Sequence, residues 1–227
     1  MAAGLKQGAS DATYDAQFSG VTTIATGDIG TYEGYGFRLA STTGLLTGTL
    51  SGAPIFSFRN ATANRKARIL AVNVNAEGAV QTTAIAMTLS MYIARSFTAS
   101  DSGGTALAGR SAGNNSNKLR TSQVASFILT GGGDARIATT GTLTAGTRTL
   151  DSNPVGNIVC GVTTTVANLI QDIPLYADYT TLYGIPLVLA ANEGFVIEAT
   201  TTLGTGTAIV GVSVLWAEVD GGAFGTG

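Results

Sequence analysis

The stretch Ala84–Ala94, with the sequence AIAMTLSMYIA, alternates large apolar residues with small or polar ones. The large residues are Ile85, Met87, Leu89, Met91 and Ile93. Successive side chains of an extended strand point to opposite faces, so this spacing puts all the large side chains on one face. A helix would distribute the same residues around its axis. The stretch therefore predicts a central strand of an antiparallel sheet, with Met87 and Leu89 buried.

A second alternation occupies residues 207–219. Its large residues on one parity are Val210, Val212, Val214 and Trp216. We expect this parity to form the core face of another central strand, with Val212 and Val214 buried. Residues 67–75 show the same period, and the pattern places Leu70, Val72 and Val74 together on one face.

The rest of the chain indicates an all-β fold. Short apolar runs are separated by glycine-containing turns, and we find no amphipathic helical pattern of about ten or more residues. Many short strands of this kind are typical of sandwiches, jelly rolls and barrels. We predict an antiparallel β-sandwich or jelly roll with an extended N-terminal arm and long polar loops. Residues 98–122 read as one such loop, and residues 171–186, which contain Pro174 and Pro186, as a further connection.

These patterns divide the chain into three parts. We assign residues 1–54 to an N-terminal arm and lead-in, residues 55–219 to the β-sandwich domain, and residues 220–227 to a glycine-rich C-terminal tail. The arm has too few large apolar residues to form a core alone, so we expect it to become ordered against a neighbouring chain. An irregular lead-in to the first strand is the alternative.

The composition is unusual for its low charge. Only 11% of the 227 residues are charged, against about 25% in ordinary soluble domains, and the net charge is −2. Such a surface indicates an assembly subunit covered by partners, or else a soluble β domain with a Thr/Ser surface. The near-neutral charge gives no strong field for DNA or lipid. No apolar run approaches a membrane helix of about 20 residues, and residues 1–18 lack the apolar core of a signal peptide. We therefore expect synthesis in the cytoplasm, without export or membrane insertion.

The sequence offers little for catalysis. It contains no histidine, which is the commonest general base and metal ligand. Residues 109–113 (GRSAG) match the hydrolase pattern Gly-x-Ser-x-Gly around Ser111, but the partner histidine is missing. The single cysteine, Cys160, lies in an apolar run and reads as a small buried residue. Asp101 and Asp134 lie in glycine-rich loops, where we expect solvated turn residues and no Ca²⁺ site. We predict no enzymatic activity, no catalytic residues, no metal and no cofactor.

One cluster of positive charge remains, and its members are Arg59, Arg65, Lys66 and Arg68. Four cations within ten residues could contact an acidic partner, so these are the candidate partner contacts. A solvated hairpin tip is the alternative. Base-stacking aromatic residues are not interleaved with the cluster, so we do not expect nucleic acid binding.

Three groups of segments stand out beyond their strand pattern. They are residues 92–105 (YIARSFTASDSGGT), 134–140 (DARIATT) with 143–148 (LTAGTR), and 186–197 (PLVLAANEGFVI) with the closing strand through residues 216–219. These segments resemble recurring blocks in virion structural proteins of tailed bacteriophages. The resemblance covers roughly residues 55–219 and excludes the N-terminal arm. It implies a virion protein without an active site, and among such proteins the capsid decoration or cement type fits this size and composition. Proteins of that type commonly have jelly-roll or related β folds and are often trimers.

We therefore expect a homo-oligomer, with a trimer favoured, that is located on the virion, binds the major capsid protein and stabilises the head. The alternative is a tail or head-fibre component that could attach to the host surface. A fibre shaft should show a repeat of fixed period, and we find none. A soluble carbohydrate-binding or hydrolytic β protein is the third class. A glycan binder should present exposed aromatic residues, yet the only tryptophan lies in the last expected strand.

Overall fold

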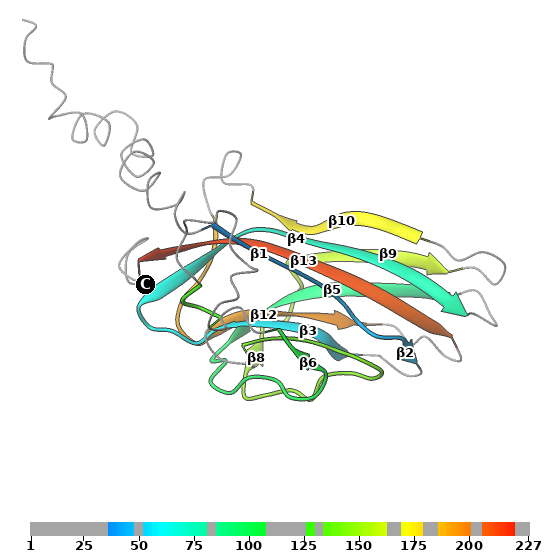
Figure 1. Ribbon diagram of the computed structural model, residues 1–227, viewed down its shortest axis with the longest axis horizontal. Helices are drawn as coiled ribbons and strands as arrows, with labels where there is room; N and C mark the ends of the chain where they lie inside the picture. Colours follow the sequence, from blue (N-terminus) through cyan, green and yellow to red (C-terminus); the bar gives the residue numbers. More distant parts are fainter. Residues whose placement is uncertain are drawn as a thin grey trace, which may run out of the picture.

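The computed structural model describes eight parts of the chain, which are residues 36–47, 52–80, 85–107, 126–129, 134–162, 169–178, 186–200 and 206–220. All regular structure in these parts is β, and none of their residues is helical. The strands form two antiparallel sheets packed against each other, so the prediction of an all-β sandwich is confirmed. Figure 1 shows β4, β13 and β1 passing above β12 and β3.

Sheet A has the order β1-β13-β4-β10, while β2 also pairs with β13 and β11 with β4. Its strands are β1 (Gly36–Thr42), β2 (Leu46–Thr47), β4 (Arg65–Val80), β10 (Leu169–Ala177), β11 (Leu187–Leu189) and β13 (Thr207–Asp220). The longest ladder joins β13 to β4 and runs from Thr207 to Asp220 along β13.

Sheet B has the order β6-β7-β3-β12-β5-β8, and β9 also pairs with β5. Its strands are β3 (Ala53–Asn60), β5 (Ile85–Arg95), β6 (Thr105–Ala106), β7 (Ala135–Ile137), β8 (Thr149–Leu150), β9 (Gly156–Val162) and β12 (Glu193–Ala199). The strands β6, β7 and β8 are short, with two or three residues each.

Both alternating stretches form central strands, as predicted. β5 lies between β12 on one side and β8 and β9 on the other, and β13 lies between β1 and β4. All four predicted core residues are buried: Met87, Leu89, Val212 and Val214. The period-2 pattern was therefore sufficient to identify both the strands and their inward faces.

The predicted inward face of β4 is wrong at Leu70. Val72 and Val74 are buried as expected, but Leu70 is only half-buried, and Ile69 occupies the core in its place. The register with β13 shifts here, since Leu215 pairs with Ala71 and the next residue pairs with Ile69. A β-bulge gives one strand an extra residue and reverses the parity of the residues beyond it.

The expected connection at residues 171–186 is also wrong in its first half, because β10 continues through Pro174. Proline lacks the N–H that a ladder needs and is tolerated in edge strands. β10 is such a strand, since it pairs only with β4 and has two register shifts along that ladder.

The sandwich begins earlier than residue 55. Residues 36–47, which we assigned to the lead-in, contain β1 and β2, and Phe37, Leu39 and Leu46 are buried in the core. Residues 1–35, which make up most of the arm, lie outside the described residues.

An aromatic cluster joins the two sheets. Trp216 of β13 stacks on Phe37 of β1, with ring centroids 5.6 Å apart. It also meets Phe58 of β3 edge-on at 5.3 Å. Phe58 in turn stacks on Phe195 of β12 at 5.4 Å. All four rings are fully buried, so the contact between Trp216 and Phe58 fixes how one sheet lies on the other.

Truncating Phe58 should test this bridge. Phe58→Ala is expected to lower the free energy of unfolding by about 3–5 kcal/mol, because the substitution removes a buried ring and leaves a cavity between the sheets. Urea denaturation followed by circular dichroism measures the loss. The control is Val159→Ala, at a side chain that is 62% exposed, where a change within about 0.5 kcal/mol is expected. Similar losses in both variants would contradict the bridge.

Candidate functional site

The four candidate partner contacts lie around the β3–β4 hairpin, which passes from one sheet to the other. Arg59 belongs to β3 in sheet B, whereas Arg65, Lys66 and Arg68 belong to β4 in sheet A. The buried Asn60 shapes the turn between them. Its Nδ2 donates to the carbonyl oxygens of Arg65 (2.8 Å) and Leu189 (3.1 Å), and its Oδ1 accepts a hydrogen bond from the Thr62 amide (3.1 Å). The cations that are adjacent in sequence are thus divided between two sheets.

Arg59 holds together three segments of the chain. Its Nη1 donates to Ser100 Oγ at 2.9 Å and lies 3.7 Å from Asp134 Oδ1. Its Nη2 donates to Asn192 Oδ1 at 3.2 Å. Ser100 Oγ also donates to Asp134 Oδ1, at 3.2 Å. The guanidinium therefore fixes a loop after β5, a loop before β7 and the turn before β12 to the end of β3.

The cations of β4 also make contacts within the chain. Arg68 donates to Asp178 Oδ2 from Nε (2.8 Å) and from Nη2 (2.6 Å). The guanidinium carbon of Arg65 lies 5.0 Å from the centre of the Phe127 ring. Lys66 is half-buried. The cluster thus stabilises neighbouring segments of its own chain, while a contact of these residues with a partner stays a prediction.

A buried ion pair between Arg148 and Asp101 was missed by the sequence analysis. The side chains are only 4% and 0% exposed. Asp101 Oδ1 also accepts a hydrogen bond from the Gly146 amide, at 2.8 Å. Arg148 lies 5.2 Å from the centre of the Phe97 ring, and Arg59 lies 6.0 Å from it. The expectation of a solvated turn is therefore wrong for Asp101. Arg148, which is distant in sequence but adjacent in space, supplies the counter-charge that allows the carboxylate to be buried.

Asp134 is also buried, which corrects the same expectation for that residue. Together with the Arg148–Asp101 pair it forms a polar clasp at the edge of sheet B. Burial lowers the pKa of Arg148, and the Glu198 carboxylate acts in the opposite direction. Two non-glycine residues beside the clasp have left-handed backbones, Ser96 (φ 49°) and Asn192 (φ 59°). The paired charges and the constrained backbone together fix the positions of these loop residues.

A buried carboxylate at Glu218 anchors the short segment Ser126–Leu129. Glu218 Oε1 accepts hydrogen bonds from Ser126 Oγ (2.5 Å), the Ile128 amide (3.4 Å) and the Trp216 indole (3.2 Å). Its Oε2 accepts one from the Phe127 amide at 2.8 Å. The sequence contained a signal for this anchor, because Glu218 continues the inward parity that ends in Trp216.

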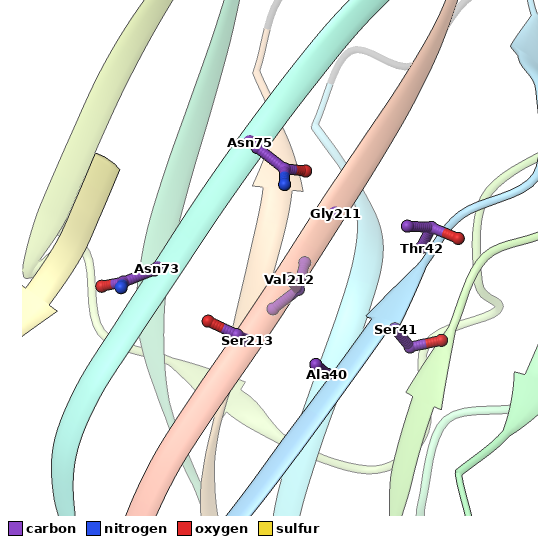
Figure 2. Close-up of a pocket in the computed structure, with 8 residues that line it drawn as sticks. All are labelled: Ala40, Ser41, Thr42, Asn73, Asn75, Gly211, Val212 and Ser213. Atoms are coloured by element: carbon purple, nitrogen blue, oxygen red, sulfur yellow. The ribbon is translucent and has the colours of Figure 1, made fainter. Parts of the chain in front are cut away.

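The outer face of sheet A contains a surface of mostly small, uncharged side chains. It forms a groove of about 370 Å³ across β1, β13 and β4. Figure 2 shows its lining residues: Ala40, Ser41, Thr42, Asn73, Asn75, Gly211, Val212 and Ser213. A second groove, of about 300 Å³, shares Ala40, Asn73 and Ser213 and extends to Arg38. The first groove contains no titratable side chain, so its chemistry suits contact and hydrogen bonding.

The remaining candidates for chemistry are limited. Cys160 is buried and unpaired, and burial raises the pKa of its thiol to about 11. The residues 109–113, including Ser111, lie outside the described residues. In the parts of the chain that the structure describes, no three acidic or cysteine side chains are grouped to hold a metal ion. No helix in those parts is long and apolar enough to cross a membrane.

Comparison of the chain with protein-family models, with characterised proteins and with solved structures found no match.

Removing one member of the buried ion pair should be costly. Asp101→Ala is expected to lower the free energy of unfolding by about 3–5 kcal/mol, because it leaves the Arg148 guanidinium buried without its ion-pair partner. The matched control is Asp151→Ala, which removes a partner of Arg95 at 3.3 Å where both side chains are at least 40% exposed. There we expect a loss of about 0–1 kcal/mol. Urea denaturation measures both, and equal losses would contradict the clasp.

The pH dependence of stability should report on Glu218. Burial raises the pKa of its carboxyl above the ordinary value of 4.5, although its four hydrogen bonds act in the opposite direction. The folded chain therefore holds this proton more tightly than the unfolded chain. The contribution of Glu218 to stability is then fully present below the ordinary pKa and is lost as the pH rises through the folded pKa.

We accordingly expect the unfolding free energy of the wild type, minus that of Glu218→Gln, to fall as the pH rises from 4.5. Glutamine has a similar shape and does not titrate, so the difference isolates this group from Glu198, whose pKa burial also raises. Urea denaturation at a series of pH values supplies the measurement. A difference that stayed constant, or that grew with pH, would refute the assignment.

Proposed function

We propose that this chain is a non-enzymatic structural protein of a virus particle, of the capsid decoration or cement type. In this role it binds the lattice of major capsid protein and stabilises the head. The observation that carries the proposal is the distribution of charge on the sandwich. Arg59, Arg68, Arg95 and Arg148 are all paired with carboxylates of the same chain, while the main groove on the outer face of sheet A is lined by uncharged and mostly small side chains.

Such a surface suits contact with other proteins. Charged side chains lose hydration when an interface covers them, so interface centres are depleted of charge. The polar clasp fixes Asp101, Asp134 and Arg148 beside the short strands of sheet B, and a pre-organised surface loses little conformational freedom when it binds. The proposal is also supported by the resemblance of residues 55–219 to virion structural proteins.

Stabilisation would come from repetition. A decoration protein binds many equivalent positions of a capsid, and copies that are linked as a homo-oligomer, with a trimer favoured, bind several positions at once. The second and third contacts are then intramolecular, so the overall affinity exceeds that of one contact without any new interaction. The protein would reside on the virion after synthesis in the host cytoplasm.

Heating of virus particles should test the proposal. Particles that lack this protein are expected to release their genome at a lower temperature than complete particles, because the bridges between capsid subunits are missing. Adding the purified protein back should restore the higher temperature, and a preparation denatured beforehand is the control. Genome release is followed with a fluorescent nucleic acid dye.

Labelling of the protein on complete particles shows whether it lies on the head or on the tail. Electron microscopy should show the label over the head. A label confined to the tail or to head fibres, together with unchanged genome release, would reject the cement function in favour of the tail or head-fibre alternative.

A further inference from the structure

Two exposed charges in the described part of the chain have no partner, and both lie on the outer face of sheet A. They are Arg38 on β1 and Glu77 on β4. The other exposed ionic groups are used within the chain, as when Arg95 binds Asp151 and Glu193. An unpaired cation and an unpaired anion therefore share one surface, and that surface is otherwise uncharged across its main groove.

The register of the sheet places these two charges symmetrically. Arg38 pairs with Leu215 of β13, and Glu77 pairs with Ile209 of the same strand. β13 lies between β1 and β4, so the charges stand on opposite sides of the central strand. The midpoint along β13 is position 212, beside the outward-facing Ser213, in the centre of the groove in Figure 2.

We propose that this face of sheet A packs against the same face of a second copy about a two-fold axis near Ser213. In a two-fold interface, if residue i of one copy contacts residue j of the other, then j also contacts i. Arg38 of each copy therefore meets Glu77 of the partner subunit. The dimer contains two such ion pairs, and each charge has one partner. Charge complementarity thus selects a second copy as the occupant.

The surface between the two charges permits close approach. Its central side chains are small or short and polar, such as Ala40, Asn73 and Ser213. Gly211 leaves space for the Asn75 side chain, which a Cβ atom at position 211 would meet. Asn75 can therefore lie across β13, and the face stays flat. Arg68 and Asp178, at the β4–β10 border, are already paired and need no partner charge.

The size of the face indicates a weak interface. With strands about 4.8 Å apart and residues about 3.4 Å apart, the four strands span roughly 20 Å across, and the stretch of β13 from Ile209, beside Glu77, to Leu215, beside Arg38, spans roughly 20 Å along the strands. This corresponds to about 400 Å² per copy, half of the roughly 800 Å² in a standard stable interface. The contact uses the outer face of sheet A, which the proposed function also offers to other proteins, and in an oligomer it would join copies of neighbouring assemblies in pairs.

A charge swap tests the proposal directly. Analytical ultracentrifugation of the purified protein should show concentration-dependent dimers that weaken as salt is added. Arg38→Glu and Glu77→Arg should each raise the dissociation constant at least about tenfold, since each puts like charges opposite one another. The double variant re-forms both pairs with reversed polarity and should return to within about threefold of the wild type. Both positions are exposed, so folding should be unaffected, and circular dichroism checks this.

Cross-linking tests the position of the axis. A residue close to a two-fold axis faces its own copy, so Ser213→Cys should form a disulfide-linked dimer under mild oxidation. Asn157→Cys, at an exposed position on β9 of sheet B, is the matched control and should remain monomeric. The native Cys160 is buried and should not compete. A monomer at every concentration, a double variant no better than the single ones, or equal cross-linking at both cysteines would overturn the proposal, and genome release would test the capsid function separately.

Discussion

The contact between Trp216 and Phe58 is the constraint on which the rest of the structure depends. Each sheet could satisfy its own backbone, but this edge-on contact and the rings stacked behind it help to fix one sheet over the other. The same strand that supplies Trp216 also supplies Glu218, which holds residues 126–129, and the centre of the outer face of sheet A. One face of β13 therefore packs in the core, and its other face forms part of the outer contact surface.

Electrostatics has a narrower role, which is to fix loops. The chain has few charges, and in its described part several of them form pairs that connect segments far apart in sequence, as Arg148 does with Asp101 and Arg68 with Asp178. A buried ion pair adds little net stability, since desolvation offsets much of the attraction, but it penalises every arrangement that leaves one partner alone. Long polar loops acquire defined positions in this way, and the surfaces between them can remain uncharged.

Sequence periodicity predicted the fold well because the core of a sheet depends on local alternation. The inward faces of β5 and β13 followed directly from it, whereas Leu70 did not, because a bulge is a property of the pairing with another strand. Pro174 suggested a break and is instead accommodated at an edge, which only the sheet order reveals. The ion-pair network was invisible for the same reason, since nothing near Asp101 in the sequence points to Arg148. The four cations around the hairpin were found, but sequence proximity concealed their division between two sheets.

The position of β13 also bears on the order of events during synthesis. It inserts between β1 and β4, although about 130 residues separate it from β4 along the chain. Contacts between such distant segments form slowly. Until residue 220 has left the ribosome, β1 has no neighbour on the side that β13 will occupy, and the core lacks Trp216. A nascent chain therefore exposes apolar surface and unpaired strand edges to chaperones and proteases until its last central strand is in place.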